Sequence, residues 1–490
     1  MTANINKVFS GVLAGRGIKI VLIVLAAIYL VTMYNRYIQA DENWFGEQAY
    51  WLLKEGKVKL KSIPLIFNWD TEFLVYHKLL VWFGAGIIKV FGWSVYPLKA
   101  FNLLCFIVCL LLIRKYLANE SSAFKYLLMA IVLLTPLSLV KSFEFRPEVP
   151  VMMFGFASFL FLSKYLDSGR IIQICIAGLL AGLAFLVHLN GAIFCVTGVL
   201  VLLWYKKLKG AIVFSLIAIP VCFIYFLNLL EGDNFAQWAY NLKNWPSHNF
   251  SRAVDQNILI TIVDRIISEQ KRFFWNGEVA GISVLFFASL ILKGKYLWNN
   301  HRVLILYTTS QILLLALLGS HKAPRYLMFH VPFMALVIAY TIKNIAEQDK
   351  AWAKISILVL LLAQVVFLMV GAAHILRKNN PHASKHEEVL SHIPQGASLI
   401  GPWELIYNGL ENHQIYSYRS YEYLEEKMPV PFTQEQVSAK IDSMQIEYIV
   451  IDEDMKTNDV YHWFPDWEIS EKIPFKEYYR GEDYLILKKQ

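Results

Sequence analysis

Long apolar runs separated by short polar stretches make up the first three quarters of the chain. A helix that crosses a bilayer needs about 20 mostly apolar residues, with a range of about 17–25. Eleven runs meet or approach this length, so the pattern predicts eleven transmembrane helices. They cover residues 18–34, 96–113, 124–140, 150–166, 171–187, 191–204, 211–230, 273–292, 303–319, 326–342 and 355–376.

One further apolar stretch does not fit a spanning helix. Residues 74–92 carry His77, Lys78 and Lys89 among their apolar side chains. A helix with a charged face and a wide apolar face lies in the membrane interface rather than across the bilayer. We therefore predict an amphipathic surface helix in this stretch.

The chain changes character after residue 376. Residues 377–490 contain no apolar run that is long enough to span. Strand-like and helix-like runs occur together in this tail, at 397–400, 403–410, 433–444, 446–451 and 484–487. Such a mixture predicts a small α/β domain. The expected architecture is an α-helical polytopic membrane domain, residues 1–376, followed by a C-terminal α/β domain, residues 377–490.

The composition agrees with a membrane protein. Hydrophobic residues make up 57% and charged residues 17% of the chain, against about 45–50% and about 25% in soluble domains. This excludes a soluble enzyme, a disordered protein and a fibrous one. The net charge of +8 is the sum of two parts with opposite charge. The tail carries 12 Lys and Arg and 20 Asp and Glu, whereas residues 1–376 carry 34 Lys and Arg and 18 Asp and Glu. The basic residues lie in short loops, so we interpret them as topology signals and expect no nucleic-acid partner.

The positions of Lys and Arg predict the sidedness. With the N-terminus inside, the inner segments hold 16 Lys and Arg in 65 residues, and the outer segments hold 16 in 127. This asymmetry follows the positive-inside rule. We therefore expect an integral protein of the bacterial inner (plasma) membrane with a cytoplasmic N-terminus. The first outer loop, 35–95, the outer loop 231–278 and the C-terminal domain would all lie on the periplasmic, outer side.

An acidic pair, Asp41 and Glu42, follows the first predicted span in QADENWFGEQAYWLLKEGK. A carboxylate at the membrane surface can act as a general base. Asp41 can equally cap a helix that begins near Asn43. The two roles are compatible, because a capping carboxylate can still face a cleft.

Three charged residues, Glu144, Arg146 and Glu148, precede the fourth predicted span in SFEFRPEVPVMMFGF. Glu148 in a first helical turn would complement the helix dipole. Charges beside the bilayer core are costly, and they therefore often mark a functional site. Both interpretations remain open on the sequence alone.

A basic cluster precedes the tenth predicted span in SHKAPRYLMFHVP, and His188 lies at the tip of a tight hairpin between two spans. Arg and Tyr at a span end can be interface anchors, and a single His at such a tip can simply have its hydrogen bonds satisfied. One His, one Lys and one Arg together also suit a phosphate group. The cluster consists of His321, Lys322, Arg325 and Tyr326.

Taken in order, these motifs resemble the GT-C superfamily of polyprenyl-phosphate-sugar glycosyltransferases, which includes protein O-mannosyltransferases and lipid A aminoarabinose transferases. The Asp-Glu pair looks like the acidic motif of that family's first outer loop. The segment FRPE looks like its arginine-plus-acid motif, and PRYL looks like its segment before a late span. The stretch GLAFLVHLNG is similar to its glycine-rich span with a polar tip. The resemblance covers residues 20–376.

The resemblance implies a reaction. The donor would be a sugar on a polyprenyl phosphate, and a hydroxyl of an acceptor glycan, lipid or protein would attack its anomeric carbon. Asp41, with Glu42 beside it, would be the general base. The donor phosphate would be bound by Arg146, Lys322, Arg325, His188 and His321. Supporting roles would fall to Glu144, Glu148, Tyr326, Glu72 and His77.

Two features of the family are not matched. The first outer loop reads DTEFLVYHK and lacks the proline of the family's Glu-Lys-Pro segment, so Glu72 and His77 are only loose counterparts. Some members have a lysine where His188 stands. A divalent metal ion could assist the leaving phosphate, but no ligand spacing in the sequence marks a metal site. No other cofactor is expected.

Two other functions share many of these features. A transporter or flippase of lipid-linked glycans would also have a polar outer face, but it usually has polar or interrupted helices at mid-membrane, and the predicted spans are nearly free of charge at that depth. A glycan ligase or polymerase that uses a lipid-diphosphate donor would also have outer arginines and histidines. The Asp-Glu pair directly after the first span favours the monophosphate donor. The sequence does not indicate which sugar or which acceptor is used.

Overall fold

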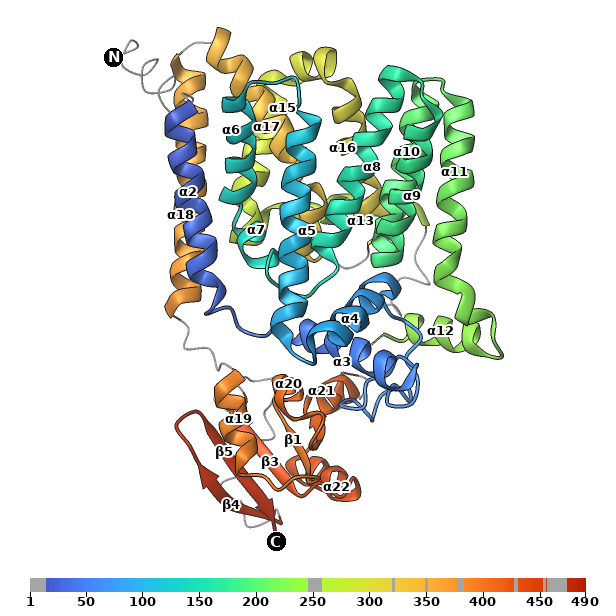
Figure 1. The fold of residues 1–490 in the computed structure, drawn as a ribbon, viewed down its shortest axis with the longest axis vertical. Helices are drawn as coiled ribbons and strands as arrows, with labels where there is room; N and C mark the ends of the chain where they lie inside the picture. The colour runs from blue at the N-terminus through green and yellow to red at the C-terminus, as the bar shows by residue number, and fades with distance from the viewer. Residues whose placement is uncertain are drawn as a thin grey trace.

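The computed structural model describes residues 15–245, 258–319, 322–348, 351–377, 383–426, 431–452, 455 and 474–490. Within these ranges a bundle of long helices forms one part of the molecule, and a small sheet with short helices forms the other (Figure 1). Helix α2 begins at the end of the bundle far from the sheet, and the chain ends in the sheet.

The bundle helices follow the predicted spans. They are α2 (Gly15–Met33), α5 (Val95–Tyr116), α6 (Ser122–Leu134), α7 (Pro136–Lys141), α8 (Glu148–Ser168), α9 (Ile171–Val187), α10 (Ala192–Trp204), α11 (Leu208–Phe223), α15 (Gly277–Asn300), α16 (Arg302–Leu318), α17 (Val331–Gln348) and α18 (Ala351–Arg377). In the described chain, 6 helices are long and apolar enough to cross a membrane, and shorter apolar helices coincide with the other predicted spans. The chain is thus an integral membrane protein. The number of eleven spans stays a prediction.

In two of the predicted spans, an interruption near a proline lies close to the predicted site. The third is divided between α6 and α7 at Thr135, which is extended (φ −75°, ψ 117°) because Pro136 follows it. The tenth begins with a 3-10 helix, η4 (Pro324–His330), before α17 continues. Both interruptions lie next to predicted site residues, because the segment 142–147 follows α7 and Arg325 lies in η4.

The two loops predicted to be outer contain helices of their own: α3 (Ala40–Glu55), α4 (Lys78–Phe91), α12 (Asn234–Lys243), α13 (Ile258–Ser268) and α14 (Gln270–Phe274). Helices α3, α4 and α12 lie at the end of the bundle that faces the sheet (Figure 1). Helix α4 buries Leu80 and Ile88 on one side and exposes Lys89 with the apolar Val90 and Phe91, whereas Lys78, predicted on a charged face, is buried. The predicted surface helix is therefore present, and it lies outside the group of long helices.

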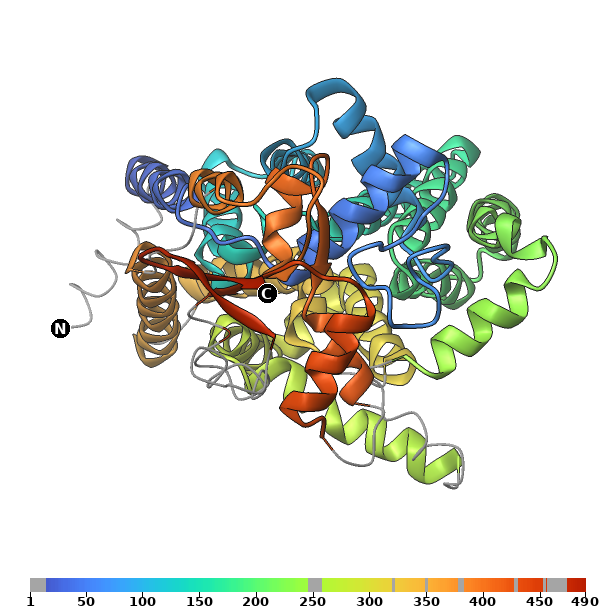
Figure 2. The ribbon, with the colours of Figure 1, turned by 90° about the horizontal axis from the view of Figure 1, so that it is seen from below.

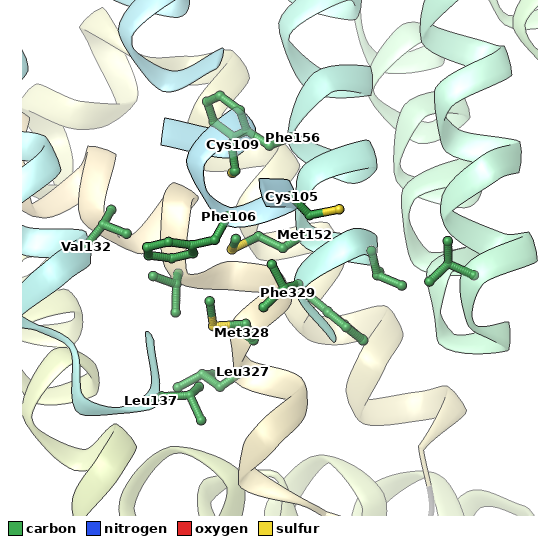
Figure 3. Packing of buried hydrophobic residues seen from close by; sticks show 14 of the residues in the cluster. Cys105, Phe106, Cys109, Val132, Leu137, Met152, Phe156, Leu327, Met328 and Phe329 are labelled. Carbon is green, nitrogen blue, oxygen red and sulfur yellow. The ribbon is translucent and has the colours of Figure 1, made fainter. Parts of the chain in front are cut away.

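The core of the bundle fixes η4. Leu327, Met328 and Phe329 are fully buried. Figure 3 shows Met328 and Phe329 near Met152 of α8 and Phe106 of α5, and Leu327 beside Leu137 of α7. Such close packing leaves η4 little freedom, so the neighbouring Arg325 and Tyr326 are held in place by the apolar core beneath them.

The tail forms a five-stranded mixed sheet in the order β2-β1-β3-β5-β4. Its strands are β1 (Ser398–Gly401), β2 (Gln414–Ser417), β3 (Tyr448–Asp452), β4 (Phe475–Arg480) and β5 (Tyr484–Lys489). Strands β2, β1 and β3 are parallel, and β3, β5 and β4 are antiparallel. The helical elements are α19 (Ala383–Ser391), η5 (Trp403–Leu405), α20 (Ile406–Gly409), α21 (Arg419–Glu425) and α22 (Gln434–Ser443). The predicted α/β character is confirmed; the pattern misses the edge strands β2 and β4, which are partly exposed.

The tail domain is packed directly against α3, as the view from below also shows (Figure 2). The Tyr407 hydroxyl donates to the Glu42 carbonyl at 2.7 Å. The Trp403 indole N–H donates to the Glu47 carboxylate at 3.4 Å. Gly46 allows this approach, because a Cβ there would lie 2.3 Å from the Tyr407 hydroxyl oxygen. Helix α3 is therefore held between the bundle and the tail.

Candidate active site

Helix α3 begins at Ala40, so the predicted start near Asn43 is wrong. Gln39 is the N-cap residue, and its backbone N–H donates to the Glu42 carboxylate at 2.9 Å. The predicted capping role of Asp41 is wrong for the same reason. Asp41 lies in the first helical turn, and its carboxylate is available for contacts outside α3.

Glu42 is completely buried and fully engaged. Its carboxylate accepts from the Phe145 N–H at 2.8 Å and forms an ion pair with the Lys99 ammonium at 2.9 Å, in addition to the Gln39 bond. These partners leave no acceptor directed to a substrate. The predicted catalytic role therefore does not fit Glu42, which instead fixes the start of α3 and with it Asp41.

Arg146 joins the segment before α8 to the start of α3. Its guanidinium donates to both carboxylate oxygens of Glu148, at 3.1 and 2.9 Å, and to the Gln39 side-chain oxygen at 2.8 Å. It also forms an ion pair with Asp41. The Arg146 side chain is only 3% exposed. The sequence predicts a phosphate ligand here, but protein acceptors occupy most of its N–H groups, so Arg146 orients Asp41 instead.

Asp41 and Arg325 are the charged groups of this cluster that reach the surface. Their side chains are 41% and 36% exposed, whereas the Glu148 side chain is 1% exposed. Arg325 Nε lies 3.5 Å from a Glu148 oxygen and makes no hydrogen bond within the described residues. Glu148 therefore holds both arginines, and the Arg325 guanidinium retains donors for a ligand.

The surroundings keep Asp41 ionised. Burial would raise the pKa of the Asp41 carboxyl, but the guanidinium of Arg146, with a smaller contribution from Arg325, holds this pKa below its usual value. Asp41 is thus a carboxylate at neutral pH, which is the form that can accept a proton.

Two histidines stack beside the arginines. The rings of His77 and His188 lie 4.3 Å apart between centroids. Burial lowers the pKa of His77 to about 4. Burial also lowers the pKa of His188 well below its usual value, and the neighbouring His77 adds to this effect. The Nδ1 atom of His188 accepts from the Asn190 N–H at 3.0 Å, so in the neutral ring Nε2 carries the proton. His188 is therefore an uncharged donor.

Tyr326 connects this pair to Arg325. Its ring lies 5.3 Å from the His188 ring, and the Arg325 guanidinium lies 5.4 Å from the Tyr326 ring centroid. The structure thus brings together six predicted residues from separate segments, at the ends of the bundle helices that face α3 and α4. They are Asp41, His77, Arg146, Glu148, His188 and Arg325, with Tyr326 packed against the last two.

Lys322 belongs to another cluster. Its ammonium forms an ion pair with Glu269 at 2.9 Å and donates to the Ala316 carbonyl at 2.8 Å. Arg272 also pairs with Glu269, at 2.6 Å. The Lys322 side chain is buried and holds the segment before η4, so the prediction of a phosphate ligand does not fit it. His321 lies outside the described residues.

Of the predicted supporting residues Glu144 and Glu72, the first borders the site and the second does not. Glu144 is buried and pairs with Lys141 at 2.7 Å, and it lies 3.9 Å from Arg146 Nε, so it borders the site. Glu72 lies half-buried in the turn before α4, and among the described residues its carboxylate takes no part in the ion pairs of the cluster.

Sequence reasoning missed two contributors. Lys99 neutralises Glu42, and a lysine inside the predicted span 96–113 was a usable signal, because intramembrane charges commonly mark a site. Tyr423 of the tail domain has no such signal. The Tyr423 ring lies 6.3 Å from the ring of Trp44, which follows Asp41 by three residues, and burial together with the charge of Asp41 raises the pKa of the Tyr423 hydroxyl.

An aromatic cluster closes the site on the side of the tail. Trp44, three residues after Asp41, lies 5.3 Å from Trp69, 5.5 Å from Trp245 and 5.8 Å from Trp403 between ring centroids. These rings come from the first outer loop, the loop 231–278 and the tail. Within the described residues no three His, Cys, Asp or Glu side chains gather as metal ligands would.

The middle of the chain matches a known family. Residues 76–230 match the family model described as dolichyl-phosphate-mannose-protein mannosyltransferase. This segment includes His77, Arg146, Glu148 and His188. No curated protein matches the chain in sequence.

Solved structures resemble the chain over almost its full length. ArnT from Cupriavidus metallidurans in the apo state has a TM-score of 0.57 at 12% identity, over 96% of this chain and 97% of that one. The same protein bound to undecaprenyl phosphate has a TM-score of 0.57 at 11% identity, over 97% and 98%. AglB from Archaeoglobus fulgidus, in complex with an inhibitory peptide and a dolichol-phosphate, has a TM-score of 0.54 at 12% identity, over 91% of this chain and 71% of that one.

The chain has the GT-C glycosyltransferase fold. The fold class predicted from the order of the motifs is therefore confirmed. Within the GT-C fold the family-model match begins just before α4 and ends at residue 230, after α11, so it contains most of the site but neither α3 nor η4. Asp41 and Arg325 thus come from segments outside that match.

Proposed function

We propose that this chain transfers a sugar from a polyprenyl-phosphate donor to an acceptor hydroxyl at the outer face of the bacterial inner membrane, with its N-terminus in the cytoplasm. The observation that carries the proposal is the exposed pair of opposite charges, Asp41 and Arg325, which Arg146 and Glu148 hold at the end of the apolar bundle. ArnT binds undecaprenyl phosphate and AglB binds a dolichol-phosphate within the same fold, which supports a lipid-phosphate ligand here.

The reaction uses each group in a defined way. The acceptor oxygen forms a bond to the anomeric carbon while the bond from that carbon to the phosphate oxygen breaks. Asp41 takes the acceptor proton as the new bond forms. The lipid phosphate leaves with its electron pair, and Arg325 stabilises the negative charge that builds on it. The His188 Nε2–H donates a hydrogen bond to the same phosphate.

The buried groups prepare this arrangement. Arg146 keeps Asp41 ionised and directed outward, and Glu148 fixes Arg146 by two parallel hydrogen bonds. A base and a phosphate-binding cation are thereby placed before substrate arrives, so little reorganisation is needed during the reaction. His77 packs against His188 and fixes the plane of its ring.

Asp41→Asn tests the proposal. The amide cannot accept the proton, so sugar transfer should fall by about 10²–10⁴-fold while binding of the donor lipid is retained. The measurement is transfer from a labelled polyprenyl-phosphate sugar in membranes, with the exposed Asp233→Asn as the matched control. Activity close to wild type would leave Asp41 as a structural residue of α3. Transfer from a lipid-diphosphate donor alone would favour a ligase or polymerase.

A further inference from the structure

A cavity of about 350 Å³ lies between the first outer loop and the tail domain. It is separate from the Asp41 cluster, because none of its lining residues belongs to that cluster. Ligand sites in proteins typically have volumes of about 300–1,000 Å³. The polar and aromatic residues that line it are Trp51, Lys61, Asp70, His413, Gln414 and Tyr416.

The cavity contains hydrogen-bond acceptors that the described protein leaves open. The Asp70 carboxylate is half-buried and takes part in none of the hydrogen bonds or ion pairs of the described residues. His413 Nε2 donates to the Ile393 carbonyl at 3.2 Å, which makes Nδ1 the acceptor. That Nδ1 atom is itself buried behind the cavity wall, so the acceptor that a ligand in the cavity can reach is the Asp70 carboxylate. A ligand rich in hydroxyl groups would supply the missing donors.

The other walls provide donors and apolar surface. The Lys61 ammonium lies 4.0 Å from the Trp51 ring centroid and 3.1 Å from the Glu55 carboxylate, so it is held beside the cavity. Tyr416 presents a half-buried ring, and Gln414 has an exposed amide. Aromatic rings together with a few placed donors and acceptors suit the apolar faces and hydroxyls of a sugar.

Other ligands fit less well. Lys61 and Asp70 carry opposite charges, so the cavity has no net attraction for a phosphate group. A peptide could add to the edge strand β2, but the Ser417 N–H of that strand already donates to the Ser62 carbonyl at 2.8 Å. The first outer loop thus closes one end of this short edge.

We propose that this cavity binds an oligosaccharide and so receives the glycan part of the acceptor. Trp51 lies on α3 about 15 Å along the helix axis from Asp41. This separation is within the length of a short oligosaccharide, which would pass around the contact between α3 and the tail, because Glu42–Tyr50 of α3 are buried. The acceptor assignment rests on the proposed function, whereas oligosaccharide binding itself does not require transfer.

The experiment measures binding of the purified full-length protein, without donor lipid, to an array of bacterial envelope oligosaccharides. Asp70→Ala and Gln414→Ala remove polar groups without hydrogen-bonded partners among the described residues, so both variants should fold. We expect wild type to retain a set of related oligosaccharides and each variant to bind them at least about tenfold more weakly. The exposed Asp233→Ala and Gln395→Ala are the matched controls and should bind as wild type does.

The outcomes separate this inference from the proposed function. Absence of oligosaccharide binding by wild type, or unchanged binding by both cavity variants, would overturn the inference even if sugar transfer is observed. Asp41→Asn should lose transfer and keep oligosaccharide binding. A third outcome is that oligosaccharide binding depends on Asp70 and Gln414 but the protein transfers no sugar from any polyprenyl-phosphate donor. In that case the inference would stand and the proposed function would be wrong.

Discussion

Arg146 and Arg325 carry the same charge in very different surroundings. Arg146 is almost fully buried and is bound by Glu148, Gln39 and Asp41, whereas Arg325 is more than a third exposed and lies against Glu148 and the Tyr326 ring. A planar guanidinium can hold two acceptors at once, and an ammonium cannot. Replacement by lysine should therefore affect the two positions for different reasons.

Replacement of Arg325 by lysine should weaken the contact with the leaving phosphate. Arg325→Lys keeps the charge but loses the two-pronged geometry, so we expect turnover to fall at least about tenfold, or about 1.4 kcal/mol of transition-state stabilisation. The assay is transfer of labelled sugar in membranes. Arg302, whose guanidinium lies over the Trp298 ring at 5.3 Å, is a matched control at the other end of the bundle. Full activity of Arg325→Lys would exclude this residue as the phosphate clamp.

Replacement of Arg146 by lysine should instead act through the ionisation of Asp41. Arg146 lowers the pKa of Asp41, and lysine cannot hold Glu148 and Asp41 together, so this pKa should rise in Arg146→Lys. The base works only when ionised, hence activity is lost as the pH falls through its pKa. The acidic limb of kcat/KM against pH should therefore lie at higher pH than in wild type. Superimposable limbs would show that Arg146 does not control Asp41.

At the scale of elements, the start of α3 decides where Asp41 lies. Three segments converge on Glu42: Gln39 before the helix, Lys99 on α5 and Phe145 before α8. Tyr407 of the tail adds a bond to the Glu42 carbonyl. The position of Asp41 thus depends on one buried ion pair more than on the helix propensity of α3.

Glu42→Gln tests this structural role. It leaves the Lys99 ammonium buried without a counter-charge, a change that typically costs about 3–5 kcal/mol. We expect a clearly lower midpoint of thermal unfolding in detergent. Glu120→Gln is the control, because the Glu120–Lys343 pair is partly exposed and should contribute no more than about 1 kcal/mol. Wild-type stability with lost turnover would instead assign Glu42 a catalytic role.

At the scale of the whole molecule, the tail and the Asp41 cluster lie on the same side of the membrane domain. Helix α3 contacts both, and the tail lies at the end of the bundle that carries α3 and α4 (Figure 1). A topology that places one outside therefore places the other outside too. The predicted eleven spans and the inner excess of Lys and Arg put this side outside the cytoplasm.

A reporter enzyme that is active only after export tests the sidedness. Fused after Gln490, it should be active, and inserted after Lys206, between α10 and α11, it should be inactive. The two fusions control each other for expression. Activity of only the Lys206 insertion would mean that the bundle is oriented the other way, with Asp41 facing the cytoplasm.

The sequence by itself determined the features that depend on local pattern. The length of the apolar runs located the bundle helices, because a bilayer demands a fixed span. Apolar runs likewise located β1, β3 and β5, which are the inner strands of the sheet. The motifs named Asp41, Arg146, Glu148, His188 and Arg325 as site residues. Charges at the edge of an apolar bundle are costly, so the four charged residues stood out in their segments, and His188 stood out by its place at the tip of a hairpin between two spans.

Only the tertiary structure decided which partner each charge has. Asp41 and Arg146 are 105 positions apart, and Glu42 and Phe145 are 103 apart, so no local pattern links them. The same long-range contacts engage Glu42 and Lys322 in buried ion pairs, and they bring His77, which the sequence predicts as a supporting residue, into the candidate site. The cavity beside Trp51 exists only because the tail packs on the first outer loop. Pairing in a buried site follows from which side chains meet in space, and that is a property of the packed fold.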